Sequence, residues 1–197
     1  CSSNVQEVMD MAVVAHLSAI EGRVPFVHFF DGFRTSHEIS DVYAWNYNDL
    51  KMMINNKSVA DFKRHSLNPE RPWLAGSAQN SDVYFQMREA SNRYYDQLPD
   101  IVEKYMNEIN RLTNSNYHLF DYIGDEDATV VIAAMGSVCE TAVETYEYLK
   151  DTGVKVGLIK VRLYRPFSVE HFLSVLPETV EVINVLDRTK EPGSAGE

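Results

Sequence analysis

Seven positions near the start of the chain share one helical face. They are Val5, Met9, Ala12, Val13, His16, Leu17 and Ile20. Gly22 follows this run at the place where a helix end favours glycine at C′. The next run, residues 24–30, is short, aromatic and β-branched, and it predicts a strand that tolerates Pro25 near its start.

Residues 45–120 show helical spacing and no strand pattern. Apolar residues recur around positions 50–54, 59–62 and 83–87, and Pro99 opens a further helix whose apolar positions run to Leu112. Residues 68–76 are predicted to form a loop between the second and third of these helices. We interpret this Tyr-rich stretch as a connection between domains or a wrap around one.

From about residue 121 apolar runs alternate with helical patterns. Strands are predicted at residues 130–135, 155–161 and 182–186, with a capped helix that ends at Gly153 and a short helix at 168–175. Such apolar strands alternating with helices are typical of a parallel sheet covered on both faces. The predicted fold class is α/β, with partial parallel sheets and covering helices, joined by the helical segment.

Three capping boxes accompany these elements. They are Ser3-x-x-Gln6, Thr35-x-x-Glu38 and Ser137-x-x-Glu140. In each box the hydroxyl can accept from a free backbone N–H, and the residue three positions on can reach back to the cap. Each therefore predicts the start of a helix.

Composition and charge exclude several classes of protein. The chain has 197 residues, 45% of them hydrophobic, and a net charge of −11, which argues against disorder and against a general nucleic-acid binder. No run is long enough for a membrane helix, and no signal peptide is present. The two cysteines, Cys1 and Cys139, indicate a reducing, cytoplasmic setting and are not spaced as metal ligands. Both ends of the chain read as cut, so we expect a piece of a longer protein.

Polar side chains follow each predicted strand, where open parallel sheets bind ligands. In residues 31–38, Arg34 could bind an anion and His37 could act as an acid or base. The structural alternative pairs Asp31 with Arg34 and uses Thr35 as a cap. Gly136-Ser137 could hold an anion at a helix start, although an ordinary cap is the favoured interpretation.

Basic residues cluster near the end of this acidic chain. They are Lys160, Arg162, Arg165, Arg188 and Lys190. They could bind a phosphate-bearing ligand or form ion pairs between domains, and both interpretations stay open. Cys139 is interpreted as a buried structural thiol, and His16 and His28 as core histidines. Glu7 and Asp10 share a helix face and are expected to be solvated.

Seven motifs carry a resemblance that runs in order along the chain. They are Ser2-Ser3-Asn4-Val5-Gln6-Glu7, Phe29-Phe30-Asp31-Gly32-Phe33-Arg34-Thr35-Ser36-His37-Glu38, Gly76-Ser77-Ala78-Gln79-Asn80, Leu119-Phe120-Asp121-Tyr122-Ile123-Gly124, Met135-Gly136-Ser137-Val138-Cys139-Glu140-Thr141, Lys160-Val161-Arg162-Leu163-Tyr164-Arg165-Pro166-Phe167 and Leu186-Asp187-Arg188-Thr189-Lys190-Glu191-Pro192-Gly193. Together they resemble pyruvate:ferredoxin (flavodoxin) oxidoreductase, also called pyruvate synthase.

The resemblance implies an activity and a set of cofactors. Members oxidatively decarboxylate pyruvate to acetyl-CoA and CO₂ in anaerobic metabolism, and they pass electrons to ferredoxin or flavodoxin. They are large, multidomain, usually homodimeric, and use thiamine diphosphate, Mg²⁺, [4Fe–4S] clusters and coenzyme A. This chain alone is expected to bind none of these cofactors and to be inactive without the remaining domains of the enzyme.

The resemblance also implies a domain division. Residues 1–120 resemble the later part of the pyrimidine-type domain with a helical extension, and residues 121–197 the beginning of a transketolase C-terminal-like domain. The family's catalytic and cluster motifs have no match here, so no catalytic residue or metal ligand is assigned. The cleft candidates are Asn4 and Gln6 at the first helix start, then Arg34 and His37.

Two other functions stay open. The chain could be a stand-alone α/β module that binds a phosphorylated ligand through its basic cluster. It could also be part of another 2-oxoacid oxidoreductase with a different substrate.

Overall fold

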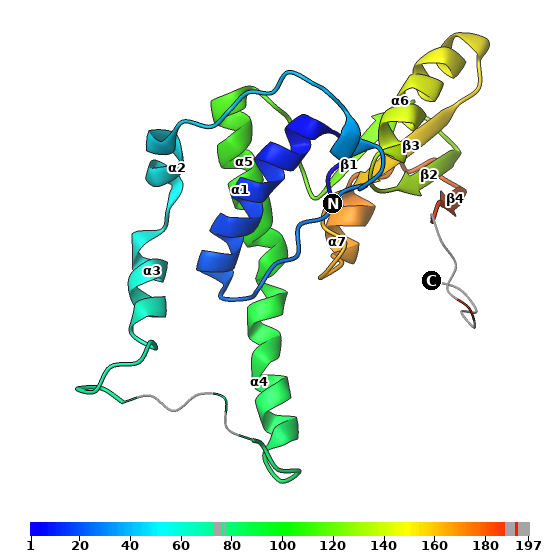
Figure 1. The fold of residues 1–197 in the computed structure, drawn as a ribbon. Coiled ribbons are helices and arrows are strands. Elements are labelled where there is room, and N and C mark those ends of the chain that lie inside the picture. Colours follow the sequence, from blue (N-terminus) through cyan, green and yellow to red (C-terminus); the bar gives the residue numbers. More distant parts are fainter. Residues whose placement is uncertain (73–75, 77, 188–191, 193–197) are drawn as a thin grey trace. The chain divides into compact units, whose positions relative to one another are not determined.

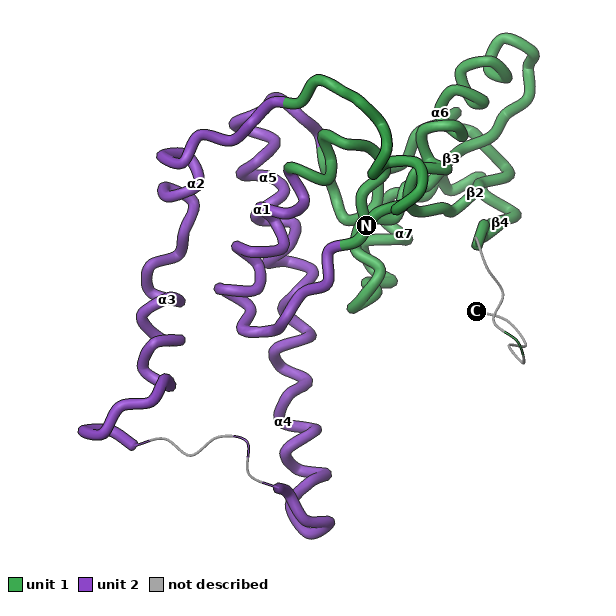
Figure 2. The backbone as a smooth tube through the Cα atoms, viewed as in Figure 1, with its two compact units in different colours: residues 1–9, 29–42, 117–197 green, residues 10–28, 43–116 purple. Residues whose placement is uncertain are grey.

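The structure is a computed structural model that describes residues 1–72, 76, 78–187 and 192. The described chain divides into two compact units (Figure 2). Unit 1 comprises residues 1–9, 29–42 and 117–197, and unit 2 comprises residues 10–28 and 43–116. Parts of the predicted loop 68–76 and of the motifs at 76–80 and 186–193 lie outside the described residues.

Unit 1 is built on a four-stranded sheet with the order β1-β3-β2-β4 (Figure 1). β2 (Val130–Ala134), β3 (Val156–Val161) and β4 (Val182–Val185) are parallel, which confirms the three predicted strands. The continuous apolar runs explain this placement, because β2 and β3 lie inside the sheet. β1 (Phe120–Gly124) was not predicted, and it pairs antiparallel with β3 at the edge.

Two helices complete the βαβαβ unit. α6 (Val138–Leu149) follows β2, continues into the 3₁₀ helix η2 (Lys150–Thr152), and ends at Gly153, whose φ is 80°. Gly153 is therefore the predicted stop, because this left-handed conformation favours glycine. α7 (Val169–Ser174) lies between β3 and β4. Cys139 of α6 packs with Ala134 and Leu158 in a buried cluster.

Unit 2 is helical. α1 (Val5–Gly22) begins in unit 1 and contributes its residues from 10 onward to unit 2, and α5 (Leu98–Thr113) lies beside it in Figure 1. Glu21 of α1 accepts hydrogen bonds from Lys104 Nζ at 2.7 Å and Tyr105 Oη at 2.5 Å. Burial on α5 follows the predicted helical face: Leu98, Val102, Tyr105, Met106 and Ile109 are buried. Pro99 stands in the first turn of α5, as predicted.

Three further helices occupy the predicted helical stretch: α2 (Tyr47–Met53), α3 (Asn56–Lys63) and α4 (Tyr84–Asp96). α2 and α3 start at asparagine caps, since Asn46 Oδ1 accepts from Asn48 N and Asn55 Oδ1 from Ser58 N. The sequence search for hydroxyl caps missed both. The described helices include none whose length and apolarity would let it cross a membrane.

The strand predicted at residues 24–30 is wrong. This segment is extended, but it forms only one bridge, between Phe30 and Ser2. Val27 is 85% exposed, so the apolar run does not mark a buried strand. The helix end was also misplaced by one residue: Gly22 is the last helical residue, and Arg23 takes the left-handed conformation with φ of 60°.

The three capping boxes form differently from the prediction. At α1 the cap is Asn4 rather than Ser3, because Asn4 Oδ1 accepts from Glu7 N at 2.9 Å. Thr35 opens only a short 3₁₀ helix, η1 (Thr35–His37). Ser137 precedes α6 as expected, but its hydroxyl forms no cap hydrogen bond.

We expect Gly157→Ala to lower the free energy of unfolding by about 1–3 kcal/mol, since overpacking forces neighbours to move. Gly157 pairs with Gly124 across β1 and β3, and an added Cβ would lie 2.5 Å from the ring of Tyr122. That ring is held by its hydroxyl, which donates to the Asp125 carbonyl at 2.5 Å. Urea unfolding measures the change. Gly32→Ala is the control, because its Cβ would meet nothing within 4 Å; equal stabilities would contradict the packing argument.

Candidate functional site

The start of α1 is fixed by Glu7. The Glu7 carboxylate accepts from Ser3 N at 2.8 Å, while the Glu7 backbone N–H donates to Asn4 Oδ1. This reciprocal arrangement satisfies two backbone N–H groups at the helix start. Asn4 is half-buried and serves as the cap, and Gln6 is half-buried in the first turn.

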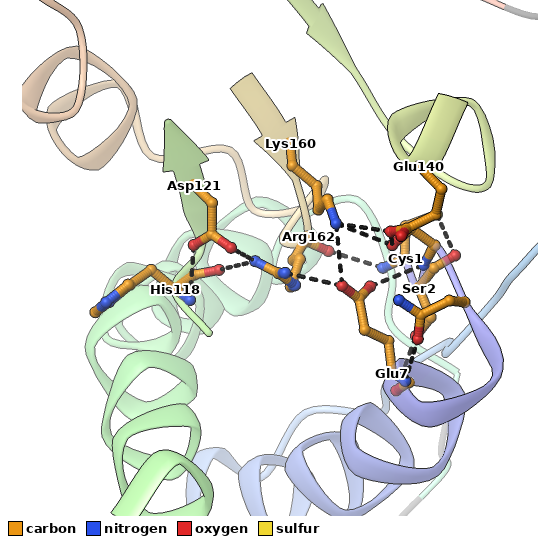
Figure 3. Close-up of polar contacts among 10 residues, drawn as sticks. Cys1, Ser2, Glu7, His118, Asp121, Glu140, Lys160 and Arg162 are labelled. Atoms are coloured by element: carbon orange, nitrogen blue, oxygen red, sulfur yellow. Dashed lines mark hydrogen bonds and ion pairs between the residues drawn. The ribbon is translucent and has the colours of Figure 1, made fainter. Parts of the chain in front are cut away.

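Glu7 also joins a buried network of charges at the end of β3 (Figure 3). Arg162 Nη2 donates to Glu7 Oε1 at 2.9 Å, and both side chains are only 4% exposed. Lys160 Nζ lies 3.3 Å from the same oxygen and 2.8 Å from Glu140 Oε1. Arg162 pairs in addition with Asp121 of β1. The network therefore joins α1, β1, β3 and α6 within unit 1.

Neutral groups complete the network. The Ser3 hydroxyl donates to Glu140 Oε1 at 2.6 Å, and Lys160 Nζ lies 3.2 Å from Ser3 Oγ. Arg162 Nη1 donates to the His118 carbonyl at 3.3 Å, and its guanidinium stacks on the ring of Tyr117. Arg162 Nε has no hydrogen-bond partner among the described residues. The remaining polar atoms are paired, as burial of charge requires.

The network keeps Glu7 ionised. Burial by itself raises the pKa of this carboxyl, but the charges of Arg162 and Lys160 outweigh burial and lower the pKa to about 2. For Lys160, burial favours the neutral amine, yet the carboxylates of Glu7 and Glu140 raise its pKa above the ordinary value. At neutral pH both groups are therefore charged.

These contacts bear on two of the five residues of the basic cluster. Lys160 and Arg162 are buried and paired with carboxylates, so they form internal ion pairs rather than a phosphate site. Arg165 stacks on the ring of Tyr164, with its guanidinium carbon 4.8 Å from the ring centre. Arg188 and Lys190 lie outside the described residues.

The expectation that Glu7 and Asp10 are solvated is wrong. Glu7 is 3% exposed and Asp10 is fully buried, where its Oδ1 accepts from Trp45 Nε1 at 2.9 Å. The sequence contained one indication of this pairing. Lys160 and Arg162 lie at the end of an apolar strand, where buried cations need anionic partners such as Glu7. His16, predicted in the core, is exposed, and His28 is half-buried.

A cavity of about 590 Å³ opens at the carboxyl ends of β2 and β4. Its lining includes Asp31, Arg34, Ser137 and Asp187. The Asp31 carboxylate accepts from Ser137 N at 2.5 Å and so takes the place of an external anion at the start of α6. A Cβ at Gly136 would lie 2.6 Å from Asp31 Oδ2, so glycine permits this close approach.

Arg34 and His37 lie on the segment that follows Asp31. The Arg34 guanidinium forms no ion pair with a described residue, so the predicted pairing with Asp31 is not formed. His37 is exposed, and its Nδ1 lies 2.9 Å from Ser36 Oγ and 3.3 Å from the Gly32 carbonyl. Arg34 thus lines the cavity, whereas His37 is held by its own loop.

Cys139 is fully buried, and burial raises the pKa of its thiol to about 11. This confirms the interpretation of a structural thiol, because the reactive form is the thiolate. The described residues contain no group of three or more His, Cys, Asp or Glu side chains that could hold a metal ion.

Two family models match the chain. One, described as pyruvate flavodoxin/ferredoxin oxidoreductase, thiamine diP-bdg, matches residues 1–107. The chain belongs to the pyruvate flavodoxin/ferredoxin oxidoreductase family. The other, described as pyruvate:ferredoxin oxidoreductase core domain II, matches residues 128–197. Glu7 therefore lies in the first family region, and its partners Glu140, Lys160 and Arg162 lie in the second.

Curated relatives match along nearly the whole chain. A pyruvate-flavodoxin oxidoreductase of Enterobacter agglomerans is 55% identical over 99% of this chain and 17% of its own length. A pyruvate:ferredoxin oxidoreductase of Moorella thermoacetica is 57% identical over 100% of this chain and 17% of its own length. A pyruvate dehydrogenase [NADP(+)] of Cryptosporidium parvum is 48% identical over 98% of this chain and 10% of its own length. The chain thus spans about a sixth of the length of the first two.

A solved structure also aligns with the chain. It is a 2-oxoglutarate:ferredoxin oxidoreductase from Magnetococcus marinus, 16% identical, with a TM-score of 0.33 over 60% of this chain and 17% of the other.

The family's cofactors can be tested against these residues. With two cysteines in all, the chain cannot supply the four thiolates of a [4Fe–4S] cluster. The Asp31 carboxylate accepts from Ser137 N and covers the start of α6, where a diphosphate could bind. The family model that matches residues 1–107 is nevertheless described as thiamine diphosphate-binding.

We expect Arg162→Met to lower the free energy of unfolding by about 3–5 kcal/mol, since Glu7 and Asp121 would lose their buried partner. The double variant Glu7→Met, Arg162→Met should lose less unfolding free energy than the two single variants together. In the double variant, neither member of the pair is left as a buried charge without its partner. Urea unfolding of the four proteins gives the coupling energy. Lys150→Met is the control on an exposed pair with Glu147 and should change stability little. Additive losses for Glu7 and Arg162 would contradict their coupling.

We also expect the stability of the chain to fall in acid through Glu7. Its pKa is lowered from 4.5 to about 2 on folding, so its contribution is present above pH 4.5 and is lost as the pH falls toward 2. That contribution is about 3 kcal/mol. Glu7→Gln should therefore show a shallower loss of unfolding free energy between about pH 5 and pH 2. Urea unfolding across this range measures both slopes, and equal slopes would exclude Glu7 as the source.

Proposed function

We propose that this chain forms part of a pyruvate:ferredoxin (flavodoxin) oxidoreductase, which oxidatively decarboxylates pyruvate to acetyl-CoA and CO₂. The observation that carries the proposal is the 55–57% identity, over 99–100% of the chain, to relatives of that name. The order of family regions along the chain, thiamine-binding and then core domain II, supports it.

The proposed role of the chain within that enzyme is structural support near a cofactor cleft. Its ionisable groups at the start of α1 are fixed in ion pairs, which suits orientation rather than proton transfer. Asn4, Gln6, Arg34 and His37 are the proposed cleft residues. Thiamine diphosphate and Mg²⁺, the [4Fe–4S] clusters and coenzyme A are proposed to be held mainly by other domains, and they supply the chemistry of decarboxylation and electron transfer.

The domain division proposed for this role follows the sequence. Residues 1–120 are proposed as the later part of the pyrimidine-type domain with its helical extension, and residues 121–197 as the beginning of the transketolase C-terminal-like domain. The gap between the two matched family regions, from residue 107 to residue 128, supports a boundary near residue 120.

The proposed partners are the remaining domains of the enzyme, a second subunit of a homodimer, and ferredoxin or flavodoxin, in the cytoplasm. This stretch does not select the electron acceptor. Relatives named for flavodoxin, ferredoxin and NADP⁺ are 48–57% identical to it over nearly its whole length. All three names include pyruvate, which favours pyruvate over another 2-oxoacid.

A chimeric enzyme tests the proposal. The aligned 196-residue stretch of the Moorella thermoacetica relative is replaced by this chain, and pyruvate-dependent reduction of a viologen dye is measured with thiamine diphosphate and coenzyme A. We expect turnover within about tenfold of the parent enzyme, a barrier change of about 1.4 kcal/mol or less. We expect none from the 197-residue chain alone, because its two cysteines cannot hold a [4Fe–4S] cluster and the remaining domains of the enzyme are absent.

Two outcomes would contradict the proposal. One is a folded, cofactor-loaded chimera that does not turn over pyruvate. The other is turnover by the isolated chain, which would place the chemistry in residues to which we assign support. The parent enzyme with its own stretch re-inserted is the control for the exchange, and 2-oxoglutarate in place of pyruvate tests the alternative substrate class.

A further inference from the structure

The carboxyl end of β3 is occupied by a contact from within unit 1. Open α/β sheets bind ligands beyond the carboxyl ends of their parallel strands. β3 ends at Val161, and the cations Lys160 and Arg162 stand on either side of this residue. Both donate to Glu7 in the first turn of α1, as Figure 3 shows. The start of α1 is therefore held at the edge of the sheet where such folds place their chemistry.

Glu7 also fixes the residues through which the chain enters α1. Its carboxylate accepts from Ser3 N at 2.8 Å, its backbone N–H donates to Asn4 Oδ1 at 2.9 Å, and its carbonyl accepts from Ser2 Oγ at 3.2 Å. Each of these bonds holds a different residue before the helix. The place of the Glu7 side chain against β3 therefore sets the place of residues 2–4 as well.

The cation that faces Glu7 cannot follow it if it moves. The far side of the Arg162 guanidinium pairs with Asp121 of β1 and donates to the His118 carbonyl at 3.3 Å. Its guanidinium carbon also lies 5.0 Å from the centre of the Tyr117 ring. Because Arg162 is held from both sides, the carboxylate of Glu7 has one position in which it meets Nη2 at 2.9 Å.

Stability alone does not account for these charges. Replacement of a buried ion pair by well-packed apolar side chains of similar volume is often neutral or stabilising. Apolar side chains do not supply direction, however, whereas charge-assisted hydrogen bonds fix both the distance and the orientation of the groups that they join. The network at the end of β3 is therefore suited to orient the first turn of α1.

We propose that Glu7 is a positioning residue for the reaction of the enzyme, which holds the first turn of α1, with Asn4 and Gln6, in the geometry that turnover requires. This inference rests on the proposed function, in which Asn4 and Gln6 are cleft residues. The thiamine-binding description of the family model for residues 1–107 supports it. Glu7 is 3% exposed, so it acts through its neighbours and does not contact the substrate.

The chimeric enzyme described above tests this role through the double variant Glu7→Met, Arg162→Met. We expect the apolar pair to recover much of the stability that Arg162→Met loses, measured by urea unfolding. We expect kcat, counted per bound thiamine diphosphate, to stay at least about tenfold below that of the unsubstituted chimera. The KM for pyruvate should change less than about threefold, because the lost contact orients reacting groups and does not bind substrate.

Hydrogen exchange in the same two proteins gives a measurement that does not depend on turnover. In the double variant the amide of Ser3 loses its carboxylate acceptor. We therefore expect the peptide that covers residues 1–9 to exchange at least about tenfold faster in the double variant than in the unsubstituted chimera.

Glu21→Gln is the matched control, because Glu21 lies at the other end of α1 and pairs with Lys104 and Tyr105 of α5. It should lower stability and leave both kcat and the exchange of residues 1–9 unchanged. The proposal is overturned if the double variant has the kcat of the unsubstituted chimera, if the two exchange equally at residues 1–9, or if Glu21→Gln lowers kcat as much. Failure of the proposed function is seen separately, as an unsubstituted, cofactor-loaded chimera that does not turn over pyruvate.

Discussion

The pairing of Glu7 with Arg162 is the constraint on which the rest of unit 1 depends. Two side chains that are each 4% exposed can stay charged only if they face each other and their remaining polar atoms are bonded. The sheet supplies the cations at the end of β3, and α1 supplies the anion in its first turn. Because Glu7 also accepts from Ser3 N, the same carboxylate fixes both the helix start and its place against the sheet.

This constraint separates structural charges from charges that can bind a ligand. In the sequence, Lys160 and Arg162 resemble an anion-binding site, yet both are buried and form ion pairs with carboxylates of the same unit. In the same way, the Asp31 carboxylate accepts from Ser137 N and occupies the start of α6. Arg34 has no such internal partner among the described residues, and it lines the cavity at the carboxyl ends of β2 and β4.

The sequence predicted the elements that follow from local residue patterns and missed the contacts between residues far apart in the chain. The strands β2, β3 and β4 follow from continuous apolar runs, and α5 follows from its periodic face and Pro99. β1 was missed because Asp121 and Gly124 interrupt its apolar pattern. A strand was wrongly predicted at residues 24–30 because this segment is apolar although Val27 within it is exposed. The charge network could not be read from spacing, since Glu7 and Arg162 are 155 positions apart. Only the requirement that buried cations have partners pointed toward it.

The network has a consequence for how the two family regions are combined. Glu7 belongs to the thiamine-binding region, while Lys160 and Arg162 belong to core domain II. Exchange of either region for one that lacks the matching charge leaves an ion buried without its partner, at a cost of about 3–5 kcal/mol. A single domain has roughly 5–15 kcal/mol of stability in all. The two regions therefore form one electrostatic unit, even though they match separate families of sequence, and a compatible exchange must carry both halves of the pair.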